Sequence, residues 1–294
     1  MLEAQKLVWE WLMSRHVVMC CGAKVEIVGK EVRVLDEPLT KRCPLQTMAY
    51  GYEEIDKEVV KRKMEMKIGK LGFASKERIF ITEPRVPYGA SEMIMSCLEE
   101  GVFDCAVTVC EGAGTVLAST PELVQMIGAF LSGIVETSPV PEIIKKLKDS
   151  GGVILDESTA AIDQVSGVEL AAKRGYKRVA VTVAGFRSWE IPRIRELEKR
   201  LKIDATVFAV CTTRCEPEDA QNLLLSDLVW ACNSKVVRKM VAPKAIFQLG
   251  VAIPVFALTD KGKKAIFVHL MKMKEPFVVF RTKLPYLAPG KLPE

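Results

Sequence analysis

Between residues 163 and 258, short β-branched runs alternate with amphipathic helical stripes, and this alternation limits the chain to few folds. Buried strands are expected at 178–183, 205–210 and 227–231, each followed by a helical stripe. Parallel strands need a crossover connection, so repeated strand, helix, strand steps favour a parallel sheet. The pattern predicts an α/β fold with mostly parallel, doubly wound sheets and helices on both faces.

Neither end of the chain shows this alternation of strands and helices. Residues 16–35 alternate and are rich in valine, which predicts a small antiparallel β-meander, and residues 53–68 predict a surface helix with a stripe through Val59 and Met66. After a turn at 261–262, residues 263–270 are expected to form a final antiparallel strand.

The predicted organisation has three parts. Residues 1–77 form the N-terminal meander and surface helix, residues 78–150 a first α/β half, and residues 151–294 a second half with the antiparallel C-terminal strand and a basic tail. The tetrapeptide Ala-Val-Thr-Val occurs at 106–109 and again at 180–183, which suggests two similarly built halves.

Composition narrows the class of protein. With 294 residues, 49% hydrophobic and 27% charged, the chain is too apolar to be disordered. Its longest stretch without a charge, 245–259, contains Pro254 and falls short of the ~18 apolar residues that a membrane span needs. Charges at Glu3, Lys6 and Glu10 interrupt any signal-peptide core. A cytoplasmic protein with no membrane span is expected.

Nine cysteines and two histidines restrict the chemistry. Without an export signal, the cysteines are expected to be free thiols, metal ligands or redox groups, although a small buried hydrophobe is the common fate of a free cysteine. A zinc site built on histidine would need both His16 and His269. Any metal site is therefore expected to use thiolates.

Three cysteines fall where predicted strands end. Cys110, Cys211 and Cys232 each follow a strand, and open α/β sheets bind ligands along that edge. Cys211 and Cys232 also precede expected helix starts, whose dipoles would favour the thiolate. Cys43 lies in a turn and would join them if the meander folds over the edge. No spacing among these cysteines is a CxxC motif.

A glycine loop follows the strand predicted at 105–109. It contains Glu111, Gly112, Gly114 and Thr115, and it lacks the third glycine and the following helix of a dinucleotide-binding fingerprint. Two interpretations stay open: a tight structural turn, or a nest of backbone N–H groups that binds an anion.

Charge is concentrated near the C-terminus. Residues 235–294 carry twelve lysines and arginines against three acidic residues. They form either a docking surface for an acidic protein partner or a solvated, lysine-rich surface. The absence of interleaved aromatic residues argues against nucleic acid as the partner.

Several segments resemble methanogenesis marker protein 8, an archaeal family. The resemblance is carried by Arg42-Cys43-Pro44-Leu45, by 104–116 with the glycine loop, by 137–144, and by 253–263 with its Pro-Val-Phe-Ala-Leu-Thr run, within residues 16–270. It implies a cytoplasmic archaeal protein associated with methyl-coenzyme M metabolism, and it implies no particular reaction. Cys43, Cys110 and Cys232 lie in matching segments, whereas the remaining thiols of interest lie outside them: Cys20, Cys21, Cys211 and Cys215.

Two functions remain as hypotheses. The first is an accessory or maturation factor that binds an iron–sulfur cluster or another metal through Cys43, Cys110 and Cys232. The second is an α/β enzyme or sensor that binds a small anionic, phosphorylated ligand at the loop of Glu111 to Thr115. No residue pattern identifies a catalytic reaction.

Overall fold

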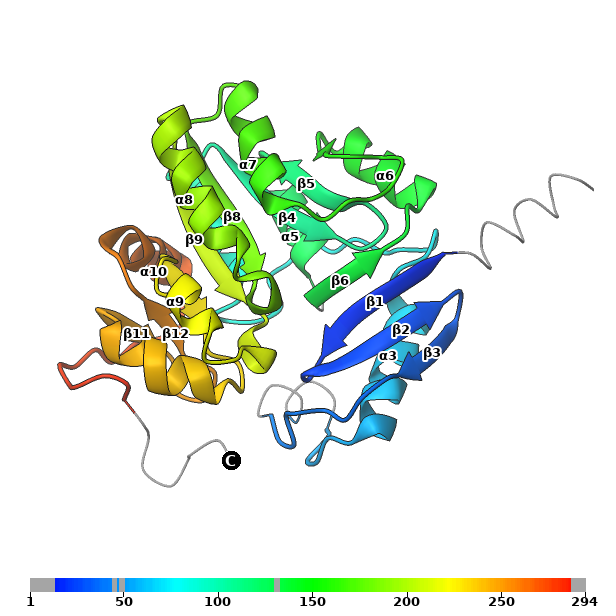
Figure 1. Ribbon diagram of the computed structural model, residues 1–294, viewed down its shortest axis with the longest axis horizontal. Helices are drawn as coiled ribbons and strands as arrows, with labels where there is room; N and C mark the ends of the chain where they lie inside the picture. The colour runs from blue at the N-terminus through cyan, green and yellow to red at the C-terminus, as the bar shows by residue number, and fades with distance from the viewer. Residues whose placement is uncertain (1–13, 44–46, 48–50, 130–132, 287–294) are drawn as a thin grey trace, which may run out of the picture.

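The computed structural model describes residues 14–43, 47, 51–129 and 133–286. It contains a four-stranded sheet, in the order β3-β2-β1-β6, and an eight-stranded sheet, in the order β11-β12-β10-β9-β8-β4-β5-β7 (Figure 1). Pro44-Leu45 of the resemblance and Lys291 of the basic tail lie outside the described residues. The strands are β1 (Arg15–Cys20), β2 (Ala23–Val28), β3 (Glu31–Val34), β4 (Cys105–Cys110), β5 (Gly114–Ala118), β6 (Gly133–Thr137), β7 (Val153–Ile154), β8 (Arg178–Ala184), β9 (Asp204–Val210), β10 (Leu228–Trp230), β11 (Phe247–Leu249) and β12 (Val255–Ala257).

Helices and short helical turns connect these strands. Two of the helices follow the strands predicted at 178–183 and 205–210, where the sequence predicts helical stripes. The α-helices are α3 (Lys57–Leu71), α4 (Ala90–Glu99), α5 (Pro121–Gly128), α6 (Pro141–Asp149), α7 (Gln164–Lys173), α8 (Glu190–Leu201), α9 (Asp219–Leu223) and α10 (Asp260–Lys272), with 3-10 turns η1 (Gly185–Arg187), η2 (Thr212–Arg214) and η4 (Ala242–Lys244) and a π-helical turn η3 (Val237–Val241).

The large sheet is parallel only at its centre. Strands β4, β8, β9 and β10 pair in parallel, whereas β5, β7, β11 and β12 pair antiparallel with their neighbours. The chain leaves β4 through a short turn at 111–113 and returns directly as β5, and a turn this short permits only antiparallel pairing. The predicted α/β class is confirmed, and the expectation of a mostly parallel sheet is corrected to a parallel centre with antiparallel edges.

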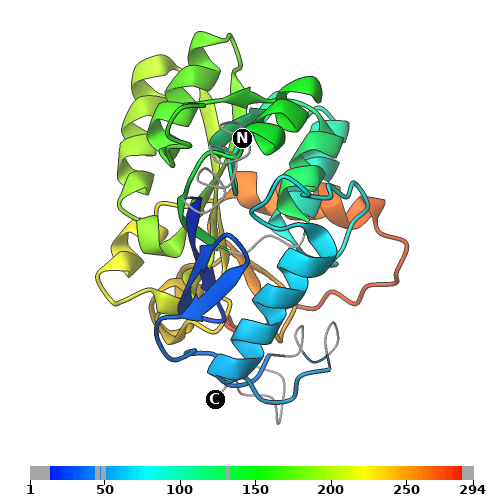
Figure 2. The same ribbon diagram turned by 90° about the vertical axis from the view of Figure 1, so that its right-hand side faces the viewer.

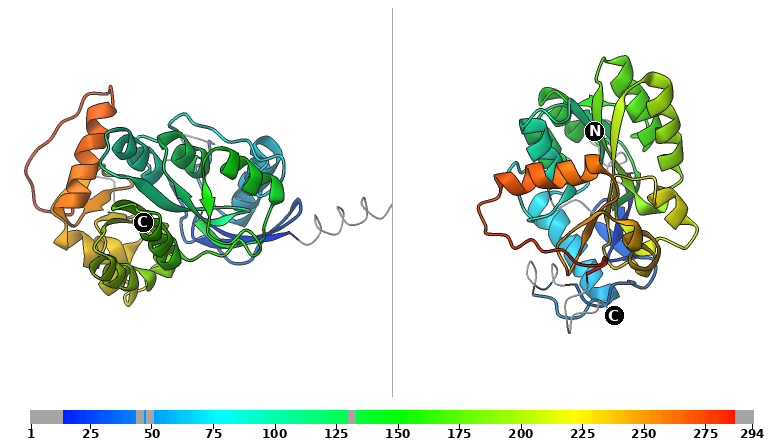
Figure 3. Two further views of the ribbon diagram at one scale, coloured as in Figure 1. Left: turned by 90° about the horizontal axis from the view of Figure 1, so that it is seen from above. Right: turned by 90° about the vertical axis from the view of Figure 1, so that its left-hand side faces the viewer.

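The winding of the sheet also differs from the prediction. The parallel strands are ordered across the sheet as they are along the chain: β4, β8, β9, β10. The helices α7, α8 and α9, which precede β8, β9 and β10, contribute to one hydrophobic core. Helices α4, α5, α6 and α10 pack in a second core on the opposite face. Figure 3 shows helices on both sides of the sheet. Helices on both faces are thus confirmed, but the parallel strands are not wound in two directions.

The repeated tetrapeptide lies on neighbouring strands. Ala106 pairs with Ala180 and Val107 with Val181 in the parallel pairing of β4 with β8. The two predicted α/β halves therefore contribute strands to the same sheet, side by side at their matching positions.

The strand expected at 263–270 is wrong, because this segment belongs to helix α10. Thr259 caps the helix by accepting a hydrogen bond from the Gly262 backbone N–H. The buried residues of the helix are spaced by three and four, which is a helical stripe and not an alternation. They are Gly262, Ala265, Ile266 and His269.

The small sheet packs against α3 and forms a third core (Figure 2). Its strand β6 comes from the chain between α5 and α6, so the sheet is tied to the large one by covalent connection. Helix α3 lies in the segment where the sequence predicts a surface helix, and one of its sides is exposed. Its buried stripe runs one position later than expected, through Val60, Lys63, Met64, Lys67 and Ile68.

Candidate functional site

The turn between β1 and β2 is docked against the carboxyl edge of the large sheet. Arg214, in the turn after β9, donates a hydrogen bond from Nε to the carbonyl oxygen of Gly22 and forms an ion pair with Asp36 at 2.7 Å. Cys20 ends β1 and Cys21 begins the turn, and Thr40 N–H donates to the Cys21 carbonyl at 3.1 Å. This docking carries two adjacent cysteines to the edge where α/β sheets bind ligands.

Five cysteines lie close enough at this edge to influence one another's pKa values, and we call them the thiol cluster: Cys20, Cys21, Cys43, Cys211 and Cys232. The Cys20 and Cys21 side chains are hydrogen-bonded to each other. Negative charge on Cys43 raises the pKa values of Cys21 and Cys232. Negative charge on Cys232 or on Cys20 raises the pKa of Cys211. The cluster joins four segments that are far apart in sequence.

Backbone strain is concentrated in the thiol cluster. Cys21, Cys211 and Cys232 adopt the left-handed conformation, with φ of 52°, 54° and 46°. Only three other non-glycine residues in the described part of the chain have positive φ. Such conformations cost of order 1–3 kcal/mol each and gather at functional sites. The strain therefore singles out the same residues as the clustering of thiols.

Two buried lysines of α3 face the cluster. Lys63 and Lys67 are 7% and 3% exposed, and both act on Cys20. The hydrogen bond from Cys21, followed by these two cations, lowers the pKa of Cys20 to about 5. Burial, reinforced by the charge of Lys63, lowers the pKa of Lys67 to about 7. These shifts favour a thiolate at Cys20 and leave Lys67 only partly protonated at neutral pH.

A buried ion pair continues this polar interior toward the glycine loop. Arg78 Nε lies 2.5 Å from Glu111 Oε1, and the side chains are 1% and 0% exposed. Arg78 also donates to the carbonyl oxygens of Ile79 and Ala129. Both members of the ion pair shift the pKa of Lys67, so the loop residue Glu111 and the thiol cluster belong to one buried region.

The structure separates the three predicted metal ligands. Cys43 and Cys232 are electrostatic neighbours. Cys110 is fully buried in a hydrophobic core against which Cys232 also packs, and its sulfur lies 3.7 Å from Glu111 Oε2. Cys110 and Cys232 do follow strands on one edge of one sheet. Two strands lie between theirs, which places the backbones roughly 14 Å apart at the usual strand spacing.

The expected thiolates at Cys211 and Cys232 are corrected. Burial raises the pKa of Cys232, and burial together with Cys232 raises that of Cys211 to about 12. Cys211 precedes a three-residue 3-10 turn and Cys232 precedes a short π-helical turn, so neither has a long helix dipole directed at it. Among these thiols it is Cys20 whose pKa is lowered, by the hydrogen bond with Cys21 and by Lys63 and Lys67, and the sequence did not indicate it.

Within the described ranges, no three side chains of His, Cys, Asp or Glu are placed to hold a metal ion together. A metal at the thiol cluster would therefore require its side chains to move. Positive charge on Lys63 and Lys67 would also disfavour a bare metal ion, because ammonium groups repel a cation and attract an anionic species.

The glycine loop is the turn between β4 and β5, and it is buried. Gly112 N–H donates to Thr137 Oγ1 at 2.7 Å, and the N–H groups of Ala113 and Thr115 donate to the carbonyls of Cys110 and Ala161. Thr115 Oγ1 donates to Gln164 Oε1 at 2.8 Å. These N–H groups already have acceptors within the protein, as in a structural turn.

The basic C-terminal segment is partly neutralised within the fold. Lys261 pairs with Glu198 and Asp204, and Lys272 pairs with Glu99 and Glu100. Within the described part of this segment, seven lysines form no ion pair: Lys235, Lys239, Lys244, Lys263, Lys264, Lys274 and Lys283.

Sequence reasoning missed Cys20, Cys21, Lys63 and Lys67. One signal was available for the lysines: Lys63 and Lys67 are four residues apart and lie among the apolar residues of one helix face. Lysines at such positions become buried, although lysine side chains normally stay in solvent. No comparable signal marked the two cysteines, whose partners lie on other segments.

Comparison with known proteins identifies the family of this chain. Residues 16–271 match the family described as uncharacterized protein conserved in archaea, DUF2099. The chain belongs to this family. It is also 39% identical over 279 residues to an uncharacterized protein of Methanocaldococcus jannaschii, a match that covers 94% of this chain and 97% of that protein. Across the described residues, no helix has the length and apolar character to cross a membrane.

Proposed function

We propose that this DUF2099 chain is an accessory protein of archaeal methyl-coenzyme M metabolism that works by thiol exchange at Cys20. The resemblance to methanogenesis marker protein 8 and membership of an archaeal family support the metabolic setting. The contact of Cys20 with Cys21, Lys63 and Lys67 supports the chemistry. A thiolate is the reactive form of cysteine, and cations beside it hold that form at neutral pH.

Thiol exchange requires a sulfur that Cys20 or Cys21 can attack. Adjacent Cα atoms are about 3.8 Å apart, which is shorter than the about 4.4 Å at which ordinary disulfides begin. A disulfide between Cys20 and Cys21 is therefore disfavoured. The partner sulfur comes from another cluster cysteine or from a bound thiol or disulfide.

The thiolate can be tested directly by its ultraviolet absorbance. We expect the wild-type chain to gain one thiolate between pH 4 and pH 6, where ordinary cysteines stay protonated. Cys20→Ser should remove this step, while Cys105→Ser, in a core where burial raises the thiol pKa to about 12, should keep it. The absence of a thiolate below pH 7 in the wild type would contradict the proposed function.

A second candidate keeps the expected metal. The neighbourhood of Cys20, Cys43, Cys211 and Cys232 could, after side-chain movement, bind an iron–sulfur cluster, whose thiolate-ligated form is anionic and compatible with the lysines. Anaerobic purification followed by metal analysis tests it. Iron and inorganic sulfide in the wild type, lost in Cys232→Ser and retained in Cys105→Ser, would favour this candidate.

The remaining expectations stay proposals. An anionic ligand at Gly112 and Gly114 has weaker support, because it would have to replace acceptors that the loop N–H groups already have. An acidic protein partner would be attracted by Lys263, Lys264 and Lys274 of the C-terminal segment.

A further inference from the structure

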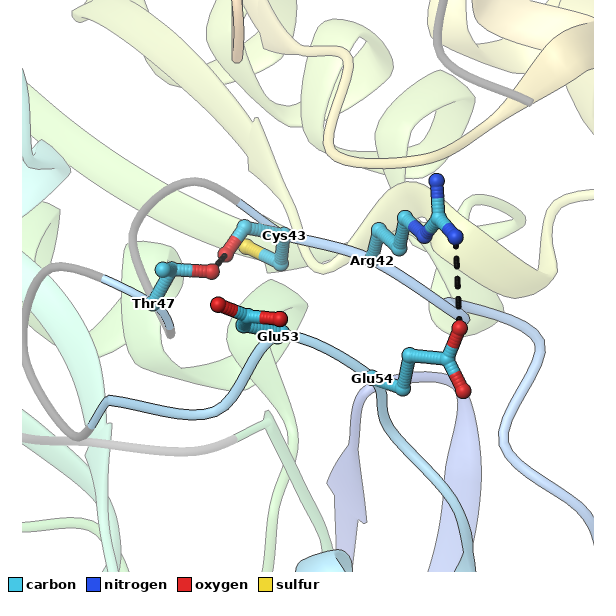
Figure 4. Close-up of a pocket in the computed structure, with 5 residues that line it drawn as sticks. All are labelled: Arg42, Cys43, Thr47, Glu53 and Glu54. Carbon is cyan, nitrogen blue, oxygen red and sulfur yellow. Dashed lines mark hydrogen bonds and ion pairs between the residues drawn. The ribbon is translucent and has the colours of Figure 1, made fainter.

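A pocket of about 450 Å³ opens on the loop before α3. Figure 4 shows Cys43 and Thr47 together at one end, where Thr47 Oγ1 donates to the Cys43 carbonyl at 3.3 Å, and the ion pair of Arg42 with Glu54 at the other. Glu53 completes the described lining. Cys43 is the one thiol among these lining residues.

The same cysteine reaches the interior. Cys43 and Cys21 both pack against the hydrophobic core that contains Cys20. Cys20 is 2% exposed, so a dissolved molecule cannot reach it directly, whereas Cys43 and Cys21 are partly exposed. Backbone hydrogen bonds anchor the loop on both sides, from Thr40 to Cys21 and from Ile55 to Lys41. Of the thiols that adjoin this core, Cys43 faces the pocket and Cys21 lies next to Cys20, and Cys43 is close enough to Cys21 to raise its pKa.

We propose that Cys43 is the access thiol of the cluster, that it exchanges with a small disulfide in this pocket, and that it passes the oxidation to Cys21. This inference rests on the proposed function and adds a substrate class. The lining carries one cation and two carboxylates, so the pocket favours cationic or zwitterionic disulfides over dianionic ones.

The step balances in atoms and electrons. The Cys43 thiolate attacks one sulfur of the disulfide RSSR, which forms a mixed disulfide and releases RS⁻. Cys21 transfers its proton to the hydrogen-bonded Cys20 thiolate, attacks the Cys43 sulfur and releases the second RS⁻. Two cysteine thiols are oxidised to the disulfide between residues 21 and 43, and RSSR is reduced to two RSH after proton uptake from water.

The test uses the full reduced chain and cystamine, a dicationic disulfide. We expect the wild type to release two equivalents of cysteamine and to yield a Cys21–Cys43 disulfide on peptide mapping. Cys43→Ser should react more slowly than the wild type by a factor of about ten or more, since the remaining thiols are buried or carry raised pKa values. Cys21→Ser should trap cysteamine on Cys43. Cys97→Ser, in the core of the opposite face, is the matched control and should react like the wild type.

Two outcomes would overturn the proposal: a wild-type rate in Cys43→Ser, or trapping of cysteamine on another cysteine in Cys21→Ser. At low salt, the dianion of dithiodiglycolic acid should react more slowly than cystamine, and the difference should shrink as salt screens the pocket. A faster reaction of the dianion would contradict the substrate class. Cys43→Ser should keep the Cys20 thiolate absorbance, so failure of the access thiol is distinguishable from failure of the proposed function.

Discussion

The Cys21 thiol donates a hydrogen bond to the sulfur of Cys20, its neighbour in sequence. This hydrogen bond is the first cause of two opposite shifts, because it lowers the pKa of Cys20 and raises the pKa of Cys21. The left-handed conformation of Cys21 accompanies the contact. One adjacent pair thus supplies both a stable thiolate and a protonated thiol.

Substitutions at Cys21 separate the hydrogen bond from the rest of the site. Cys21→Ala removes the donor and should raise the pKa of Cys20 by about one unit or more, whereas Cys21→Ser keeps an O–H donor and should raise it less. The measurement is a titration of thiolate absorbance, with the same titration of Cys20→Ser subtracted. If both variants titrate like the wild type, the hydrogen bond does not set the pKa of Cys20.

Lys67→Met tests the buried cation. The substitution removes a charge whose burial lowers its own pKa to about 7, and methionine can fill the same space on the apolar stripe of α3. We expect the free energy of unfolding to stay equal or rise by about 1 kcal/mol, while the pKa of Cys20 rises because the thiolate loses a neighbouring cation. Lys70→Met, on the exposed side of the same helix, should change neither quantity. A destabilised variant with an unchanged thiolate would contradict this role.

The parallel centre of the sheet was predictable because local sequence sets burial there. The runs at 178–183 and 205–210 match β8 and β9, since both strands are covered on two faces and read as continuous apolar segments. The winding direction was not predictable in the same way, because it depends on which distant strands pair. The segment 263–270 was misassigned as a strand because residues 261–262 were interpreted as a turn, whereas they lie in the first turn of helix α10. The buried residues of the segment have helical spacing.

The candidate site was only partly predictable. Strand ends and sequence resemblance directed attention to the carboxyl edge of the sheet and to Cys43 and Cys232, whose role as site residues stays a prediction. Cys20 and Cys21 acquire their chemistry from α3 and from docking of the β1–β2 turn on Arg214, and contacts between distant segments leave no local pattern.

Two glycines allow a controlled test of the glycine loop as a structural turn. Gly114 has φ of +70°, and a Cβ there would lie 2.2 Å from the carbonyl oxygen of Ala160, whereas Gly151 has φ of +85° with nothing within 4 Å. Gly151→Ala should lower the free energy of unfolding by about 1 kcal/mol from backbone conformation alone. Gly114→Ala should lower it by several times that amount in denaturant titration, because backbone must also shift. Equal losses would show that the approach of residue 160 is easily relieved.

The buried ion pair of Arg78 and Glu111 should behave asymmetrically. Arg78→Met leaves the Glu111 carboxylate buried without its cation and should cost about 3–5 kcal/mol. Glu111→Gln should cost less, since Arg78 keeps the carbonyl oxygens of Ile79 and Ala129 as acceptors. The double variant should recover most of the loss in urea unfolding. Additive losses in the three variants would mean that the two side chains are not energetically coupled.

His16 should make the fold sensitive to mild acid. Its side chain is 1% exposed, Nδ1 lies 2.7 Å from Thr137 Oγ1, and burial lowers its pKa from 6.5 to about 4. Between these values the unfolded chain binds a proton at this residue and the folded chain does not, so the free energy of unfolding falls as pH is lowered through that window. His16→Asn cannot titrate and should lose about 3 kcal/mol less between pH 7 and pH 4. Denaturant titrations at both pH values measure the difference, and parallel pH profiles for the two proteins would show that folding does not lower the pKa of His16.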